Sequence, residues 1–143
     1  MTKPIRPEER GWNRRDAFRA VGELAEKFDT ITLGKSNSGA FEYELHIFPI
    51  KGVCVTITIL LGDWQTNSDV VITNMTTLPE SECRKGFGTH VIQALIGWAK
   101  KHSFNEIRAT QINNIDSQRF WQRNNFVLVV EQNPTGDLVL KLS

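Results

Sequence analysis

The segment Leu78–Thr89, LPESECRKGFGT, carries the residue types in this chain that are best suited to chemistry. Two basic side chains precede a Gly-Phe-Gly sequence at the point where a helical pattern begins. The first turn of a helix has backbone N–H groups without intrahelical partners, and its dipole adds about half a positive charge. Glycine allows an anion to approach the backbone closely. The segment therefore predicts a phosphate site. Its residues are Arg84, Lys85, Gly86, Phe87, Gly88 and Thr89.

Two well-known phosphate loops do not fit this segment. A Walker A loop requires the pattern G-x-x-x-x-G-K-S/T, which the chain lacks. The dinucleotide fingerprint requires a third glycine where Val91 stands, and the chain shows no repeated βαβ units. The alternative to a phosphate site is an ordinary turn at a helix entry. The residues that follow have to distinguish these two interpretations.

Those residues carry a family resemblance. The sequence CRKGFG at 83–88 resembles the pyrophosphate loop Q/R-x-x-G-x-G/A of the GCN5-related N-acetyltransferases (GNAT), with Cys83 at the Gln/Arg position. After a helix and a strand, residues 113–126, NNIDSQRFWQRNNF, are similar to that family's segment N-x-x-A-x-x-F-Y-x-x-x-G-F. The positions that carry this second similarity are Asn114, Ser117, Phe120, Trp121, Asn125 and Phe126. Asparagine at 125 suits a helix end, because it tolerates the left-handed conformation.

The resemblance implies a fold, a cofactor and a reaction. The fold is a central, mostly antiparallel, splayed sheet flanked by helices, forming one GNAT-like domain over residues 1–143. The cosubstrate is acetyl-coenzyme A or another acyl-coenzyme A, with no metal. The reaction is the transfer of the acyl group to an amine by direct attack. The residues implied to bind the cofactor are Leu78, Arg84, Lys85, Gly86, Phe87, Gly88, Thr89, Asn114, Ser117 and Trp121.

The chain departs from the family at the position of its usual proton donor. Trp121 stands where the family has a tyrosine, and an indole donates a hydrogen bond without useful acidity. We expect Trp121 to be a packing residue. Tyr43, the only tyrosine, lies on the apolar parity of its strand and is expected in the core.

Glu42, Glu44 and His46 are the candidates for a general base or a water relay. They share one parity of an alternating strand, and a histidine near neutral pKa can pass a proton through water. The alternative is the solvated face of that strand. Arg119 and Arg123, four residues apart on one helix face, also have two interpretations. They contact a 3′-phosphate of the cofactor, or they form a solvated helix face. His90 and His102 are predicted to lie at the surface.

The periodicity predicts an α+β, or mixed α/β, order of elements. An apolar face recurs through 16–28 and again through 88–102, which predicts two helices, and Asp116–Asn124 forms a third, shorter one. A short strand is expected around Ile5. The other strands are expected at 30–33, 41–48, 53–61, 70–78, 107–112, 126–131 and 137–142. Short connections favour an antiparallel meander in the middle of the chain and a hairpin at its end.

Composition excludes several classes of protein. The chain has 143 residues, 17 Lys and Arg against 16 Asp and Glu, and a net charge of +1. This balance gives no basic footprint for nucleic acid. No apolar run approaches the roughly 20 residues of a membrane-spanning helix. The first residues have no signal-peptide pattern, so Cys54 and Cys83 are expected as reduced thiols in the cytoplasm.

Several functions fit this sequence. The first is an N-acetyltransferase that acts on a primary amine of a small molecule or a protein. The second is a coenzyme A-binding module that acts through protein interaction, which Trp121 and the lack of an evident base favour. A macromolecular acceptor such as charged tRNA is a third. Exposed strand edges can also pair between two copies of the chain, so a homodimer is a further alternative.

Overall fold

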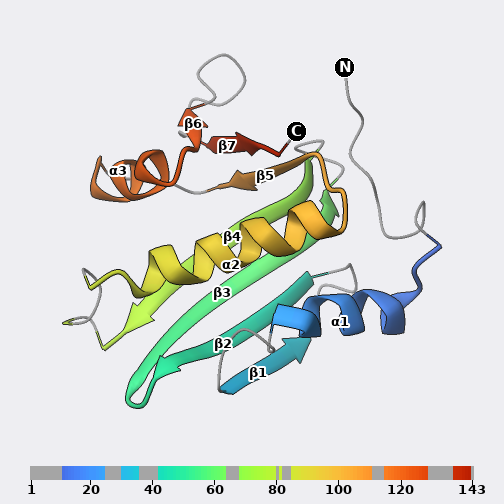
Figure 1. Cartoon of the computed structure of the whole chain (residues 1–143), viewed down its shortest axis with the longest axis horizontal. Helices are drawn as coiled ribbons and strands as arrows, with labels where there is room; N and C mark the ends of the chain where they lie inside the picture. The colour runs from blue at the N-terminus through green and yellow to red at the C-terminus, as the bar shows by residue number, and fades with distance from the viewer. Residues whose placement is uncertain are drawn as a thin grey trace.

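The structure is a computed structural model that describes residues 11–24, 30–35, 42–63, 68–79, 81, 85–110, 115–128 and 137–142. Three helices and seven strands follow one another along these residues (Figure 1). The elements are α1 (Arg14–Gly22), β1 (Thr30–Lys35), β2 (Glu42–Ile50), β3 (Val53–Asp63), β4 (Ser68–Leu78), α2 (Phe87–Lys101), β5 (Glu106–Ala109), α3 (Ile115–Arg123), β6 (Val127–Leu128) and β7 (Leu138–Lys141). The expected mixed fold is confirmed. The strand expected around Ile5 lies outside the described residues.

All seven strands form one sheet in the order β1-β2-β3-β4-β5-β7-β6. The first four strands are the predicted antiparallel meander, and β6 and β7 are the predicted hairpin. Only β4 and β5 pair in parallel. The long connection between them contains α2, as a parallel crossover requires.

The sheet opens between β4 and β5. These strands pair only from Val70 to Ile72 of β4, and the backbone N–H of Thr110 makes a last bond to the Ile72 carbonyl at 3.0 Å. The register against β3 then shifts, because Thr58 faces Asn74 while Ile59 faces Ile72. Thr73 is the extra residue of this bulge, and a bulge bends its strand. Beyond it, β4 continues along β3 alone within the described ranges, which leaves its other edge open.

Helices α1 and α2 lie side by side over one face of the sheet (Figure 1). The indole Nε1 of Trp98 on α2 donates a buried hydrogen bond of 2.7 Å to the carbonyl of Ala20 on α1. Beneath them, Tyr43, Leu45 and Ile47 of β2 are buried, as their alternation predicts. Glu44 and His46 therefore point to the opposite face.

His102 was predicted at the surface, and this is wrong. Its ring lies 5.4 Å from the ring of Trp12 and 5.3 Å from that of Trp98, centroid to centroid. Its Nε2 lies 2.9 Å from a carboxylate oxygen of Glu23, which also accepts from Lys101. This contact could not be predicted from local patterns, because Glu23 and His102 are far apart along the chain. His90 is exposed, as predicted.

Candidate functional site

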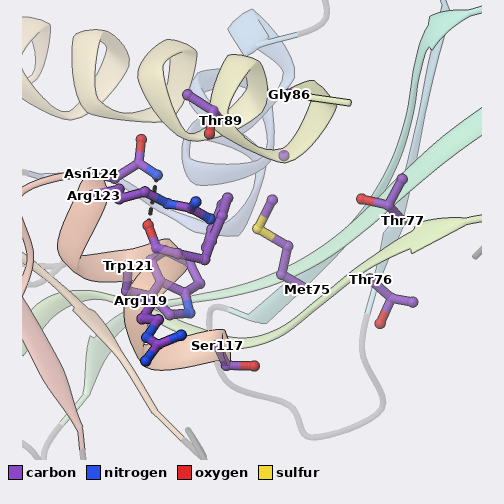
Figure 2. A pocket seen from close by; sticks show the side chains of 12 residues that line it. Met75, Thr76, Thr77, Gly86, Thr89, Ser117, Arg119, Trp121, Arg123 and Asn124 are labelled. Atoms are coloured by element: carbon purple, nitrogen blue, oxygen red, sulfur yellow. Dashed lines mark hydrogen bonds between the residues drawn. The ribbon is translucent and has the colours of Figure 1, made fainter. Parts of the chain in front are cut away.

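A cavity lies where the sheet opens. It has a volume of about 850 Å³ and runs between the far half of β4, the first turn of α2 and one side of α3 (Figure 2). The residues that line it are Met75, Thr76, Thr77, Gly86, Gly88, Thr89, Ser117, Arg119, Phe120, Trp121, Arg123 and Asn124. No carboxylate is among them, so the wall offers cations, hydroxyls and amides.

The first turn of α2 is built to receive an anion. Gly86 is the N-cap with φ +88° and ψ 2°, a left-handed conformation that glycine adopts without strain. Glycine has no side chain to cap the first-turn N–H groups, and no acidic residue lies in this turn. These N–H groups therefore keep the partial positive charge of the helix end at the cavity wall.

Gly88 serves a different purpose, because it allows α2, α3 and β4 to meet. A Cβ atom on Gly88 would lie 3.1 Å from Cε of Met75 and 3.3 Å from the ring of Phe120. Both distances are tighter than ordinary van der Waals contact, so a larger residue would push the elements apart. Gly86 has no heavy atom within 4 Å of the corresponding position. The two glycines are therefore required for different reasons.

Helix α3 brings an aromatic wall to the cavity. Trp121 is only 5% exposed, and its ring makes edge contacts with Phe120 at 5.1 Å and Phe126 at 5.0 Å. This burial confirms that Trp121 is a packing residue. The helix ends as predicted, with Asn125 at φ +72° and the N–H of Phe126 bonded to the Trp121 carbonyl at 3.0 Å.

Asn124 is a part of the site that sequence reasoning missed. It is 3% exposed, its Oδ1 accepts from Nε2 of Gln93 on α2 at 3.1 Å, and its Nδ2 donates to the Phe120 carbonyl at 2.9 Å (Figure 2). The amide therefore ties the end of α3 to α2 and fixes the width of the cavity. A polar residue at the end of an amphipathic helix was the only available signal.

A sequence model described as the Acetyltransferase (GNAT) family matches residues 21–126. This match runs from the end of α1 to Phe126, just before β6, and it includes β4, α2 and the cavity between them. The chain belongs to the GNAT acetyltransferase family. No curated protein matches its sequence.

Solved structures of GNAT proteins share the fold. An acetyltransferase of the GNAT family from Staphylococcus aureus Mu50 aligns with a TM-score of 0.51 and 11% identity over 91% of this chain and 93% of its own. Arabidopsis thaliana Naa50, in complex with the bisubstrate analogue CoA-Ac-MVNAL, aligns with a TM-score of 0.50 and 17% identity over 87% and 93%. At these identities, the likeness is one of fold.

The structure of this GNAT protein brings half of the residues predicted to bind cofactor to one cavity. These are Gly86, Gly88, Thr89, Ser117 and Trp121. Phe87 and Lys85 flank the same helix entry without lining the cavity, and Leu78 is 52% exposed at the end of β4. Arg84 and Asn114 lie outside the described residues.

The predicted catalytic cluster lies apart from the cavity, on the face of the sheet away from α1 and α2. His46 Nε2 lies 3.3 Å from a carboxylate oxygen of Glu44, and both side chains are about half exposed. Glu44 faces Thr58, and Thr58 faces Asn74 of β4. Two strand spacings, or about 10 Å, therefore separate this pair from the open edge of β4. Glu42 lies one alternation further along the same parity.

Neither a metal centre nor a membrane span is found within the residues the structure describes. No three His, Cys, Asp or Glu side chains there gather as a metal site would need. None of the described helices combines the length and apolar character required to cross a bilayer.

Proposed function

We propose that this GNAT protein transfers the acetyl group of acetyl-coenzyme A to a primary amine of a small molecule or a protein. The observation that carries the proposal is the cavity itself. It joins an uncapped helix N-terminus to the open edge of a strand, and its described wall holds two arginines and no carboxylate. A long cofactor with a pyrophosphate and an amide-rich arm needs these two kinds of backbone surface.

The pyrophosphate of the cofactor would bind to the first-turn N–H groups of α2. Gly86 lets the phosphates approach, Gly88 lets α3 and β4 pack close to the same turn, and the hydroxyl of Thr89 supplies a further donor. Arg84 and Lys85 would add charge at the same helix entry. The loop would thus bind two phosphate groups in a protein with almost no net charge.

The pantetheine arm would lie along β4 beyond the bulge, towards Leu78. There the strand pairs with β3, and no other described strand pairs with its second edge, so backbone N–H and C=O groups along that edge can bond to the amides of the arm as an added strand would. A backbone N–H near the bulge would also polarise the thioester carbonyl. Asn114, Ser117 and Trp121 of the α3 segment would border the arm on the other side.

The reaction needs a base and a proton source, and Trp121 is neither. The amine nitrogen forms a bond to the thioester carbon, the carbon–sulfur bond breaks, and the nitrogen gives up a proton. Coenzyme A leaves as a thiolate, which takes its proton from solvent, because no tyrosine stands at position 121. Glu42, Glu44 and His46 would accept the amine proton through water across the polar face of the sheet.

The coenzyme A analogue in the Naa50 structure supports the choice of cofactor, because that protein has the same fold. The first test is thermal unfolding with and without acetyl-coenzyme A. A ligand selective for the native state at 100 times its Kd stabilises that state by about 2.7 kcal/mol. No change in Tm at millimolar cofactor would sink the proposal.

The second test separates the enzyme from a binding module that lacks turnover. Release of free thiol is measured with a panel of primary amines, from small molecules to peptides. Sustained release that depends on an amine supports the transferase. A rise in Tm without release for any amine supports the binding module, which the buried indole of Trp121 favours.

A further inference from the structure

Two arginines in the cavity are not assigned to any group of the cofactor by the proposed function. Arg119 and Arg123 project from α3, one helical turn apart, and both line the cavity that also holds Gly86 and Thr89. Both side chains are exposed, and neither forms a hydrogen bond or an ion pair with another described residue. They are the only charged residues in the described lining.

These arginines line the same cavity as the first turn of α2, and residues next to them in the chain contact that helix. The ring of Phe120, next to Arg119 in the chain, would lie 3.3 Å from a Cβ atom on Gly88. The amide bridge from Gln93 to Asn124, next to Arg123, holds the two helices together at the other end of α3. Figure 2 shows the guanidinium of Arg123 directed into the cavity below Thr89, and that of Arg119 on the Ser117 side of the same cavity.

The helix dipole does not account for this arrangement. Arg123 is in the last turn of α3, where a cation gains about 0.3–1 kcal/mol from the dipole whichever way its side chain points. Arg119 lies before that turn, so it gains no such stabilisation from the helix dipole. Two cations without carboxylate partners on the wall of one cavity attract a further anion next to the one bound by α2.

We propose that Arg119 and Arg123 form a second anion subsite that binds the phosphate on the ribose of coenzyme A. The inference rests on the proposed function, since it takes the pyrophosphate to lie on the first turn of α2. The third phosphate of the cofactor then faces α3. This subsite makes the protein select the 3′-phosphorylated cofactor over 3′-dephospho-coenzyme A, a molecule that differs only by that group.

The experiment crosses two ligands with the protein variants. Calorimetry measures the Kd of coenzyme A and of 3′-dephospho-coenzyme A for the wild-type chain, Arg119→Gln, Arg123→Gln and the double variant. Lys100→Gln is the matched control, because Lys100 is an exposed cation of α2 that lies about 20 Å along the helix from its first turn. Circular dichroism and Tm verify that each variant folds.

The wild-type chain is expected to bind coenzyme A about tenfold more tightly than the dephospho form, as one charge-assisted contact gives. The double variant is expected to bring the two Kd values within about threefold by weakening only coenzyme A. Lys100→Gln is expected to keep the wild-type ratio.

A tenfold ratio that persists in the double variant would overturn the subsite. An equal loss for both ligands would overturn it as well, because it would assign the arginines to the pyrophosphate. Failure of the wild-type chain to bind either ligand would instead reject the proposed function. The three results are therefore distinguishable.

Discussion

Gly86 and Gly52 make a matched pair for testing the anion site. Both have a left-handed backbone, with φ +88° and +86°, and neither has a heavy atom within 4 Å of the position a Cβ would take. Gly86 lines the cavity, whereas Gly52 lies in the turn between β2 and β3. Substitution by alanine therefore imposes the same backbone strain at both places and adds a methyl group to the cavity at only one.

The cost in stability is expected to be equal for the two variants. An L-residue in the left-handed region loses about 1–2 kcal/mol relative to glycine, and no neighbour is displaced at either site. For a chain of 143 residues, this lowers Tm by about 3–7 °C. Differential scanning calorimetry measures the shift for Gly86→Ala and Gly52→Ala.

The cost in cofactor affinity is expected only for Gly86→Ala. The methyl group would stand between an anion and the first-turn N–H groups of α2, and the loss of one hydrogen bond to a charged group costs about 1.5–3 kcal/mol. The Kd of acetyl-coenzyme A should therefore rise by about 10- to 150-fold. Isothermal titration calorimetry of both variants, at a temperature where both are folded, measures this difference.

Two results would refute the reasoning. An unchanged Kd for Gly86→Ala would mean that the anion does not approach the backbone at this turn. An equal increase for Gly52→Ala would mean that cofactor binding follows global stability rather than local access.

Three further predictions concern residues outside the anion site. Trp121→Phe should lower the free energy of unfolding by about 0.5–3 kcal/mol and leave kcat for acetyl transfer within a few-fold, because the indole supplies no proton; a fall of 100-fold at unchanged cofactor Kd would contradict this. Although burial raises the pKa of Glu23, hydrogen bonds from His102 and a neighbouring lysine hold it below its ordinary 4.5. The difference in Tm between wild type and Glu23→Gln should be largest at neutral pH and should vanish as the pH falls through that lowered pKa. A difference in Tm that grows as the pH falls would contradict this prediction. Arg108 and Asp137 form a buried ion pair at 3.2 Å, so Arg108→Met should cost about 3–5 kcal/mol in urea unfolding, and adding Asp137→Leu should recover most of it; no recovery would show that the pair is needed for another reason.

The sequence predicts those parts of the fold that depend on local spacing. The alternation in β2 assigns Tyr43, Leu45 and Ile47 to the core, and all three are buried. Asn125 was expected to be left-handed because it follows a helix in place of glycine, and its φ is +72°. In each case, the residue type and its neighbours in the chain set the conformation.

Contacts between distant segments could not be predicted in the same way. Thr73 is one β-branched residue in a β-branched strand, and nothing in its neighbours marks the extra position that opens the sheet. His102 has its carboxylate partner 79 residues away, at Glu23. The amide bridge of Asn124 likewise needs Gln93 on another helix. Such contacts exist only after the helices have packed.

The same distinction separates the two halves of the candidate site. Phosphates bound by backbone N–H groups favour glycine at the helix entry, and the close packing of α3 and β4 requires a second glycine, so the first turn of α2 leaves a pattern at Gly86 and Gly88 that can be recognised in the sequence. The polar face of the sheet, across which the amine would lose its proton, is made from side chains on three neighbouring strands. One row of this face is Glu44, Thr58 and Asn74. An antiparallel sheet tolerates many polar residues on a solvated face, and its backbone geometry demands none of them. Cofactor recognition is therefore tied to a sequence motif, whereas acceptor recognition can vary from one GNAT protein to another without disturbing the fold.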